Sequence, residues 1–428
     1  MKKILFLTLL SIFTKLHAAD TLRVMQYNIL AYGNYTTYCT SSNNNINMKN
    51  AALRTITQYV KPDIFTVNEI SQWQPFHQQI LDSVLNLNSV TKYKKVPYSN
   101  NAGSDIINMC YYNSEKLVYH SMIVPQSYIR DINIYRFYYK STSLANGDTA
   151  FISCIQAHLK AGDATSDPQN PVDRDTMITR LMRYLNNVNK ADNYMIMGDF
   201  NVYTSSENCF QKLVNHPNLN IRFYDPINKL GNWNNNSSFA QYHTQSTHTS
   251  SGCAASGGMD DRFDFILLSN MLLNGIGNYK YISNSYKALG NDGQHYNNAI
   301  NASPQNNSVP ANVLNAIYNN SDHLPIILDL LVNTSVSVTE NEIKSPFLNL
   351  FYQNPVKDKL ELFLALEKAL KIKIRIFDIQ GKDLYDATYM LQSGNNYLNI
   401  GTDFLKKGIY FMQIQSGEYS TVKKIIIE

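Results

Sequence analysis

The chain has 428 residues, more than one typical domain needs, and combines 44% hydrophobic with 16% charged residues at a formal net charge of +4. Three of its lysines, Lys2, Lys3 and Lys15, lie in an N-terminal segment that we expect to be removed, which leaves the mature chain close to neutral. This balance excludes a strong basic field over the whole protein, so a polyanionic partner has to bind through a local patch or a metal ion.

Residues 1–19 have the pattern of an export signal. A positively charged start precedes the apolar stretch 4–13, and the small residues Ala18 and Ala19 follow it. The stretch is shorter than the ~20 apolar residues that normally span a bilayer, and we find no longer one elsewhere in the sequence. We therefore expect cleavage after Ala18 or Ala19, export, and no stable membrane insertion; a retained anchor is the alternative.

Between residues 20 and 332, apolar runs of strand length alternate with stretches of helical periodicity, which predicts an α/β domain. In the predicted helix 173–189, Met177, Leu181 and Leu185 recur at helical spacing, and Asp173 stands near the cap position. Residues 284–320, rich in Asn, Ser and Gly, predict a long loop, either an active-site wall or a tolerated insertion, with a short helix at 313–318. The predicted helices are 47–60, 73–87 and 173–189, and the predicted strands are 22–27, 63–68, 151–157, 194–197, 262–268 and 326–332.

Polar side chains stand where these strands meet loops. An α/β sheet presents such junctions at one rim, which is where ligands bind in this architecture. Mg²⁺ prefers carboxylate and amide oxygens, so we assign Asn28, Glu69 and Asp322 to a magnesium ion, with Mn²⁺ or Ca²⁺ as alternatives. The structural alternatives are a strand-end cap for Asn28 and a surface carboxylate for Glu69.

The remaining polar residues at these junctions suit hydrolysis of a phosphate ester, which needs a cation, a base for the water and help for the leaving oxygen. We predict that His323 acts on the attacking water or pairs with the transition state, while Asp264 holds its imidazole in the correct tautomer. Asp199 would orient or deprotonate the water, and Asn201 would donate to a phosphoryl oxygen. His158 would bind phosphate or stabilise developing charge. The alternative for the Gly-Asp-Phe-Asn motif is a simple polar turn.

Six short motifs in order along residues 20–332 resemble the endonuclease/exonuclease/phosphatase superfamily, and within it the secreted bacterial members. The resemblance implies a deoxyribonuclease-I-like, four-layer α/β/β/α sandwich and a metal-dependent phosphoric ester hydrolase. Members often add an aromatic or Arg side chain between the Glu and His motifs, which we do not place among Tyr98, Tyr111 and Tyr112. The motifs are Gln26-Tyr27-Asn28, Asn68-Glu69, residues 156–160, Gly198-Asp199-Phe200-Asn201, residues 262–267 and residues 321–325.

After residue 332 the sequence no longer alternates between strand and helix patterns. Residues 333–344 are polar and predict a linker, and residues 345–428 predict a small all-β sandwich because segments such as 371–377 alternate strictly. This segment resembles the sorting domain of type IX secretion substrates through Asn354-Pro355-Val356, residues 379–382, Gly408-Ile409-Tyr410 and its Lys-Lys-Ile ending. The resemblance implies passage through the outer-membrane secretion machinery and removal of the domain.

The sequence contains five cysteines, so at least one has no partner within the chain. Cys154 lies in a predicted strand whose sequence is typical of a core, so we predict that its thiol is buried. Cys209 and Cys253 both flank the predicted site and would be able to pair in an exported protein, with Cys39 and Cys110 as a weaker candidate pair.

The preferred hypothesis is a secreted, extracellular or cell-surface phosphodiesterase, exported through the periplasm, that hydrolyses DNA or RNA by attack of a metal-activated water. A hydrolase of phospholipid, sphingomyelin or another phosphate ester is the first alternative, and a catalytically silent surface-binding protein is the second. The near-neutral charge weakens the nuclease hypothesis, because duplex binding relies on basic contacts to phosphates. Arg174, Arg180 and Arg183 are candidates for such contacts, although exposed helix positions are the simpler interpretation.

Overall fold

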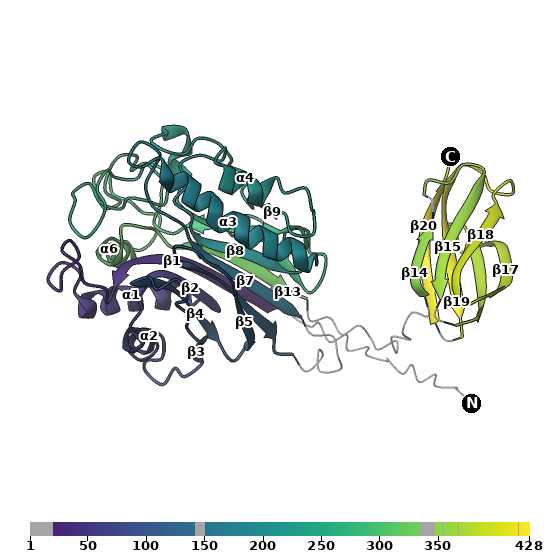
Figure 1. The fold of residues 1–428 in the computed structure, drawn as a ribbon, viewed down its shortest axis with the longest axis horizontal. Helices are drawn as coiled ribbons and strands as arrows, with labels where there is room; N and C mark the ends of the chain where they lie inside the picture. Colours follow the sequence, from purple (N-terminus) through teal and green to yellow (C-terminus); the bar gives the residue numbers. More distant parts are fainter. Residues whose placement is uncertain (1–19, 142–149, 334–346, 353, 367, 418) are drawn as a thin grey trace, which may run out of the picture. The chain divides into compact units, whose positions relative to one another are not determined.

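The structure, a computed structural model, describes residues 20–141, 150–333 and 347–428, apart from residues 353, 367 and 418. The chain divides into two compact units between Ser335 and Val336 (Figure 1). The predicted signal, 1–19, and all but the first residue of the predicted linker lie outside the described residues. Within the described ranges, no helix combines the length and the apolar character needed to cross a bilayer.

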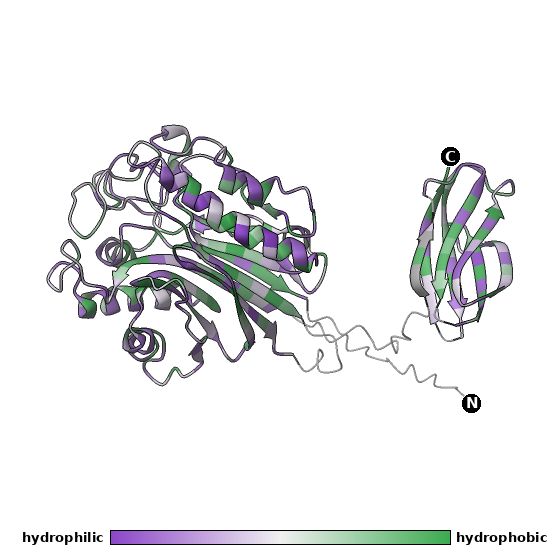
Figure 2. Cartoon of the chain, in the orientation of Figure 1, coloured by the Kyte–Doolittle hydropathy of each residue, from purple (hydrophilic) through white to green (hydrophobic). Residues whose placement is uncertain are grey.

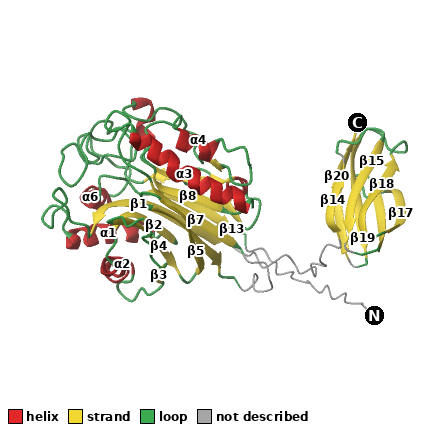
Figure 3. Ribbon diagram, viewed as in Figure 1, coloured by secondary structure: helices red, strands yellow, loops and turns green. Residues whose placement is uncertain are grey.

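The N-terminal unit consists of two β-sheets packed face to face, with helices on both outer faces (Figure 3). Val24 and Leu328 of one sheet meet Cys154 and Ile266 of the other in the core between the sheets. A second core joins the first sheet to α1, α2 and α6, and a third joins the second sheet to α3 and α4. These layers confirm the predicted four-layer α/β/β/α sandwich.

The first sheet has the strand order β11-β13-β1-β2-β4-β3, with β12 on β13, and the second has the order β5-β6-β7-β8-β10-β9. The first sheet contains β1 (Asp20–Tyr32), β2 (Ile64–Ser71), β3 (Tyr93–Lys95), β4 (Ile106–Asn113), β11 (Tyr279–Tyr281), β12 (Lys287–Ala288) and β13 (Ile326–Val332). The second contains β5 (Leu117–Ser127), β6 (Asp131–Tyr139), β7 (Phe151–His158), β8 (Tyr194–Asp199), β9 (Phe223–Tyr224) and β10 (Asp264–Ser269).

The helices follow the predicted periodicity with shifted ends. The helix predicted at 173–189 begins at Gln169, since Asp173 does not cap it but accepts hydrogen bonds from Gln169 and from the Tyr128 hydroxyl. The predicted helix 73–87 is an α-helix followed by a π-helical turn, and the predicted short helix 313–318 is longer. The helical segments are α1 (Ile46–Val60), α2 (Gln74–Ile80), η1 (Leu81–Leu85), α3 (Gln169–Val188), α4 (Asn208–Val214), η3 (Ser237–Tyr242), α5 (Asn270–Asn274) and α6 (Ala311–Asn320).

Two parallel strand pairs set the position of the functional end of the sandwich. In the first sheet β1 runs parallel to β2, and in the second β7 runs parallel to β8, so the carboxyl ends of each pair lie at one rim. The register pairs His158 with Asp199, and Asp199 in turn pairs with Asp264 of β10. Three polar residues that are distant in sequence therefore stand in one row across the second sheet.

Gly198 permits the close approach of β7 and β8 just before this row. A Cβ atom at Gly198 would lie 1.7 Å from the carbonyl oxygen of Ala157, and its φ of +144° is one that L-residues rarely adopt. The glycine of the Gly-Asp-Phe-Asn motif is thus required by strand packing rather than by a turn.

A buried polar layer lies between the two sheets beneath the rim. Asn68 accepts a hydrogen bond from Gln26 at 2.6 Å and donates one to Asn108 at 2.7 Å, both within the first sheet. Its oxygen also accepts the backbone N–H of Asp199 in the second sheet at 3.0 Å. Because buried amides are costly unless they are paired, this layer fixes how the two sheets meet under the site.

The C-terminal unit is a small β-sandwich of two sheets, ordered β14-β15-β18 and β17-β16-β19-β20. Apolar and polar residues alternate along its strands, as Figure 2 shows in stripes, and Ile372, Ile374 and Ile376 point into the core. The predicted all-β segment is confirmed. Its strands are β14 (Phe347–Tyr352), β15 (Lys359–Leu366), β16 (Leu370–Phe377), β17 (Asp383–Leu391), β18 (Gly394–Gly401), β19 (Gly408–Ser416) and β20 (Tyr419–Ile427).

We predict that Gly198→Ala lowers the free energy of unfolding by more than about 3 kcal/mol, because the new methyl group collides with the Ala157 carbonyl. Gly103→Ala is the matched control: Gly103 also has a positive φ, but open space surrounds it, so about 1–2 kcal/mol is expected. Urea unfolding followed by circular dichroism measures both. Equal losses in the two variants would contradict the packing explanation.

Candidate active site

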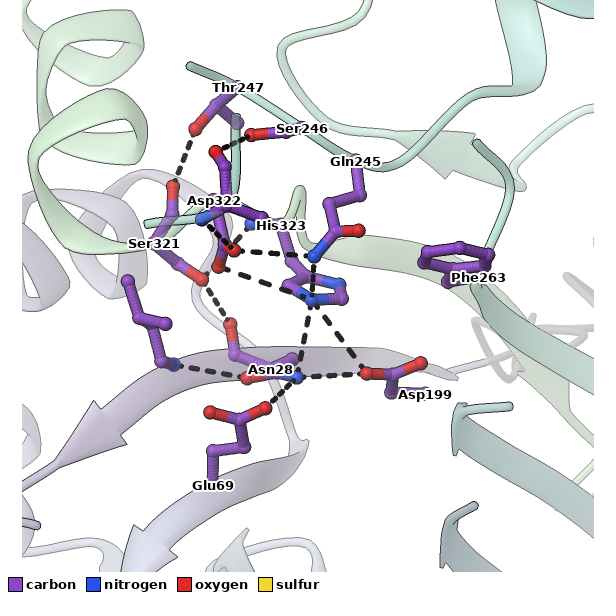
Figure 4. Close-up of polar contacts among 12 residues, drawn as sticks. Asn28, Glu69, Asp199, Gln245, Ser246, Thr247, Phe263, Ser321, Asp322 and His323 are labelled. Atoms are coloured by element: carbon purple, nitrogen blue, oxygen red, sulfur yellow. Dashed lines mark hydrogen bonds and ion pairs between the residues drawn. The ribbon is translucent and has the colours of Figure 1, made fainter. Parts of the chain in front are cut away.

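The predicted site residues of both sheets converge at one rim of the sandwich (Figure 4). The Asn28 amide nitrogen donates to Glu69 Oε1 at 2.9 Å within the first sheet. The same nitrogen donates to Asp199 Oδ2 of the second sheet at 3.0 Å and lies 3.4 Å from His323 Nε2. Asn28 is fully buried, so its amide is the junction through which the two halves of the site meet.

His323 lies between two carboxylates. Its Nδ1 is 2.7 Å from Asp264 Oδ2, and its Nε2 is 3.7 Å from Asp199 Oδ2. Burial alone would lower the pKa of His323, but the charges of Asp264 and Asp199 outweigh burial and raise this pKa well above its usual value. The imidazole is therefore oriented by Asp264 and presents Nε2 to the centre of the site.

Asp199 carries the opposite perturbation. Burial raises its pKa to about 7, and the charges of Asp264 and Glu69 add to that rise, whereas His323 opposes it. Its other oxygen accepts the backbone N–H of Asn201 at 3.0 Å. A buried carboxylate whose pKa lies near neutrality is a suitable group for accepting a proton from water.

Glu69 is held by the backbone around a strand irregularity. Its φ is +63°, and Leu30 and Ala31 opposite it also have positive φ, at the place where the β1–β2 register shifts. Ala31 N–H donates to Glu69 Oε2 at 3.0 Å, and Leu30 N–H donates to Asn28 Oδ1 at the same distance. Non-glycine residues in this conformation are strained, and such strain concentrates at functional sites.

Asp322 is fixed from a loop that the sequence motifs do not mark. Its Oδ2 accepts hydrogen bonds from the backbone N–H of Ala255 at 2.8 Å and from Gln245 Nε2 at 3.2 Å. Gln245 Nε2 also lies 2.8 Å from His323 Nε2. The other oxygen of Asp322, Oδ1, is buried and has no hydrogen-bond partner in the described part of the chain.

His158 and Asn201 line the second-sheet side of the site. His158 Nε2 lies 3.6 Å from Asp199 Oδ2 and 3.8 Å from Glu69 Oε1. Burial, followed by the positive charges of Arg130 and His323, holds the pKa of His158 well below its usual value, so this imidazole is neutral. The Asn201 amide donates to Leu159 O at 3.2 Å, which anchors the side chain beside His158.

The donor set fits a divalent cation. Carboxylate and imidazole atoms of Glu69, His158 and Asp199 lie within 4.8 Å of one another, and this group does not include Asp322. Asn28 turns its amide nitrogen toward the carboxylates, while its oxygen is bound to Leu30, so Asn28 would coordinate a cation only after its amide rotates. Of the three predicted ligands the cluster contains only Glu69, and its other members, His158 and Asp199, were predicted as catalytic residues.

Sequence reasoning missed three residues of this region. Gln245 lies in a loop without a recognisable motif, and no sequence signal marks it. Arg130, between Glu69 and His158 in the sequence, is half-buried, donates to Leu159 O at 3.0 Å and helps to lower the pKa of His158. Lys49 is buried on the apolar face of α1 and donates to Leu30 O at 2.9 Å and Asn320 O at 2.5 Å. A lysine in phase with buried helix positions was a detectable signal.

Lys49 links the two segments that carry metal-ligand candidates. Leu30 follows Asn28 by two residues, and Asn320 precedes Asp322 by two, so one ammonium group joins both backbones. Burial lowers the pKa of Lys49 to about 7, although the charges of Asp322 and Glu69 oppose this shift.

The segment between β12 and α6 supports the site indirectly. Ile300 N–H donates to Thr247 O, and Met259 N–H donates to Asn298 O, so the segment packs against the loop that carries Gln245. It contacts that loop rather than the catalytic side chains themselves.

Two cysteine predictions were wrong. The disulfide joins Cys39 to Cys253, because the loop after β1 lies against the loop 248–257. Cys209 faces the core under α4, and Cys110 faces the core between the sheets, where each is a buried free thiol. Cys154 is a buried free thiol as predicted.

Arg174 is neither a candidate phosphate contact nor the exposed helix position that we considered the simpler interpretation. Arg174 is buried, lies 2.8 Å from Glu207 and donates to the carbonyl of Gly162, so it anchors the loop after β7 instead of facing a ligand. Arg180 is exposed, and its guanidinium lies 4.9 Å from the ring centre of Tyr128.

Comparison with known proteins agrees with the two-part organisation. Residues 350–428 match the profile of a family described as a secretion system C-terminal sorting domain. No curated protein matches the chain. The two resemblances predicted from the sequence are thus confirmed, the first in its fold by the four-layer architecture and the second by the family profile.

Several solved structures are similar to 73% of this chain. They include an endonuclease/exonuclease/phosphatase from Bacteroides vulgatus (12% identity, 99% of that chain, TM-score 0.44) and TDP2 from D. rerio complexed with single strand DNA product (12%, 99%, 0.46). The human Nocturnin catalytic domain with bound sulfate anion is another (14%, 97%, 0.44). At these identities and TM-scores we draw no conclusion about activity or substrate from them.

We predict that replacing both Cys39 and Cys253 by Ser lowers the free energy of unfolding by roughly 2–5 kcal/mol, since the bond closes a loop of sequence separation 214. Hydrogen exchange at the Ala255 amide, which donates to Asp322, should accelerate because the disulfide anchors its loop. Reductant should reproduce both effects in the unmodified protein and change nothing in the variant. Unchanged unfolding and exchange would contradict the anchoring role.

Proposed function

We propose that this protein is an exported, divalent-metal-dependent phosphodiesterase whose preferred substrate is a nucleic acid. The observation that carries the proposal is the position of His323, oriented by Asp264 at 2.7 Å and facing Asp199, beside the Glu69–His158–Asp199 cluster. An oriented imidazole, a proton-accepting carboxylate and a cation-binding cluster are the parts that hydrolysis of a phosphodiester requires.

Glu69 and Asp322 would hold the cation, Mg²⁺ or alternatively Mn²⁺ or Ca²⁺, with Asp199, His158 or a rotated Asn28 completing the set. When bound, this ion supplies positive charge next to the phosphoryl oxygens. Lys49 joins the backbones that follow Asn28 and precede Asp322, and so keeps the two ends of the set at a fixed separation.

Asp199 accepts a hydrogen bond from the attacking water and takes its proton, which its pKa of about 7 favours. His323, protonated because of Asp264 and Asp199, carries a positive charge beside the phosphoryl group and stabilises the negative charge that develops there. Asp264 keeps Nδ1 protonated and the ring fixed, as a carboxylate does in other carboxylate–histidine pairs.

Neighbouring groups complete the phosphate-binding side. The neutral His158 and the remaining N–H of the Asn201 amide are donors for a phosphoryl oxygen, and Arg130 adds positive charge behind His158. The alternative substrates are phospholipid, sphingomyelin and other phosphate esters, which need the same hydrolytic groups. A surface-binding protein without activity would not require this set of oriented ionisable residues.

We also propose that the C-terminal unit directs export by type IX secretion to the cell surface or the medium. The match of residues 350–428 to a secretion sorting domain supports this part of the proposal. The unit has its own core, and the candidate catalytic residues all precede it in sequence.

We predict that Glu69→Gln and His323→Ala each reduce turnover by at least about 100-fold without unfolding the protein, because one removes a cation ligand and the other the oriented imidazole. The assay uses DNA, RNA, sphingomyelin and bis-p-nitrophenyl phosphate, with Mg²⁺ and with a chelator. Glu115→Gln and His120→Ala are matched controls, since both side chains are exposed and lie outside the site.

The chelator should abolish activity of the unmodified protein. Asp264→Asn should lower the rate but leave metal binding intact by calorimetry, whereas loss of metal would place Asp264 among the ligands instead. Near-normal turnover in both Glu69→Gln and His323→Ala would refute the proposed function.

We predict that a chain ending at Val332 keeps its kinetics on soluble substrate but accumulates in the periplasm of the native host. The reason is that the sorting unit is compact by itself and contributes no candidate catalytic residue. Fractionation with activity assays measures both effects. Normal levels in the medium would argue for a carbohydrate- or surface-binding role of this unit, and lost activity would show that the units depend on each other.

A further inference from the structure

The exposed aromatic side chains of the N-terminal unit gather at its functional end. Six aromatic side chains in the described part of this unit are exposed, and only Tyr59, at the far end of α1, lies away from the site. The others lie in loops at the rim and include the most exposed tryptophan of the chain. They are Tyr35 (45% exposed), Tyr38 (75%), Trp73 (69%), Tyr98 (40%) and Tyr128 (42%).

The topology accounts for this gathering. Tyr35 and Tyr38 follow β1, and Trp73 follows β2, both at the ends where Asn28 and Glu69 lie. Tyr98 precedes β4, which runs antiparallel to β2, so its loop returns to the same end. Tyr128 follows β5, which runs in the same direction as β7 because β6 is antiparallel to both.

Contacts join these loops into one row. The Phe76 ring of α2 lies against Gly33 in the loop that carries Tyr35, and α2 begins directly after Trp73. His77 of α2 packs on Tyr98 with ring centres 5.6 Å apart. Asp131, which follows the Tyr128 turn, accepts hydrogen bonds from the loop after Tyr98 at 2.8–3.0 Å.

The row borders the hydrolytic groups. Glu69 accepts the N–H of Ala31, next to the last residue of β1 before the loop to Tyr35, and Trp73 follows the end of β2. At the other end Arg130 donates to Leu159 O, directly after His158. A chain that lies along the row therefore passes over Glu69 and His158.

We propose that this aromatic row, Tyr35, Tyr38, Trp73, Tyr98 and Tyr128, stacks the unpaired bases of a single-stranded nucleic acid whose phosphodiester backbone enters the site. The inference rests on the proposed function. Aromatic faces stack any base that is free of its partner, whereas the bases of a duplex are covered by their neighbours. The row thus favours single strands over duplex substrate.

The neighbours of the row favour bases over lipid. Around Tyr35, Tyr38, Trp73 and Tyr98 the chain carries polar side chains, such as Thr36, Gln72 and Asn100. A loop that enters a membrane presents aliphatic side chains together with its aromatic ones. The guanidinium of Arg180 above Tyr128 adds a cation where a phosphate backbone would pass.

Intrinsic fluorescence tests this inference directly. The chain has two tryptophans, and Trp233 is fully buried, so the binding of a base at the rim changes the emission of Trp73 alone. The experiment titrates the full-length His323→Ala variant, with chelator, with oligothymidylate, with its duplex with oligodeoxyadenylate, and with phosphatidylcholine–sphingomyelin vesicles. We expect quenching by the single strand at concentrations where the duplex has little effect. Equal quenching by the duplex, or a blue shift with vesicles alone, would overturn the proposal.

Kinetics supply the second measurement. Trp73→Ala and Tyr98→Ala should each raise KM for the single-stranded oligonucleotide roughly 5- to 100-fold, with kcat and the rate on bis-p-nitrophenyl phosphate unchanged. Tyr59→Ala, the exposed aromatic residue away from the rim, is the matched control and should change neither value. An unmoved KM in both rim variants would refute the stacking role. If the unmodified protein hydrolyses no diester, the proposed function fails, while the fluorescence titration still tests the row.

Discussion

The concentration of carboxylates at one buried point is the constraint on which the site depends. Asp199, Asp264 and Asp322 come from different strands and loops and converge on His323, and Glu69 joins them through Asn28 and His158. Burial, together with the like charges of Asp264 and Glu69, opposes ionisation and raises the pKa of Asp199. The protonated imidazole of His323 and the amide donors offset the repulsion among the carboxylates, and a bound cation would offset it further.

The packing of the sheets, rather than contacts among these side chains, sets their positions. The parallel pairing of β7 with β8 sets His158 beside Asp199, and Gly198 allows it because no side chain fits against Ala157. Asn68 then joins the sheets through the backbone of Asp199. A backbone that is fixed by strand register and buried amides gives the short contacts that an oriented imidazole needs, and it confines mobility to the loops above.

The strand-end groups were predictable because local sequence couples them to the strand: an apolar run followed by Asn, Glu, His or Asp fixes both position and face. The order of the four layers was predicted from the resemblance of those motifs to the endonuclease/exonuclease/phosphatase superfamily. Gln245 and the Cys39–Cys253 bond were not predictable, because they depend on which distant loops meet, and spacing along the chain does not encode this. Lys49 lies between these cases, since its phase on α1 marks burial but not its two carbonyl partners.

An acidic centre in a nearly neutral chain also limits how a polyanion is held. The carboxylates of the candidate site repel phosphates. The guanidinium of Arg174 forms an ion pair with Glu207 inside the fold and so is not available to a phosphate. Charge attraction over the surface therefore contributes little beyond Arg130, Arg180 and a bound cation, so affinity also has to come from contacts that do not depend on net charge. Stacking on the rim aromatics is such a contact, and it selects substrates whose bases are already unpaired. An acidic centre, which in the proposed function binds a cation, is thus consistent with a rim that offers exposed aromatic side chains.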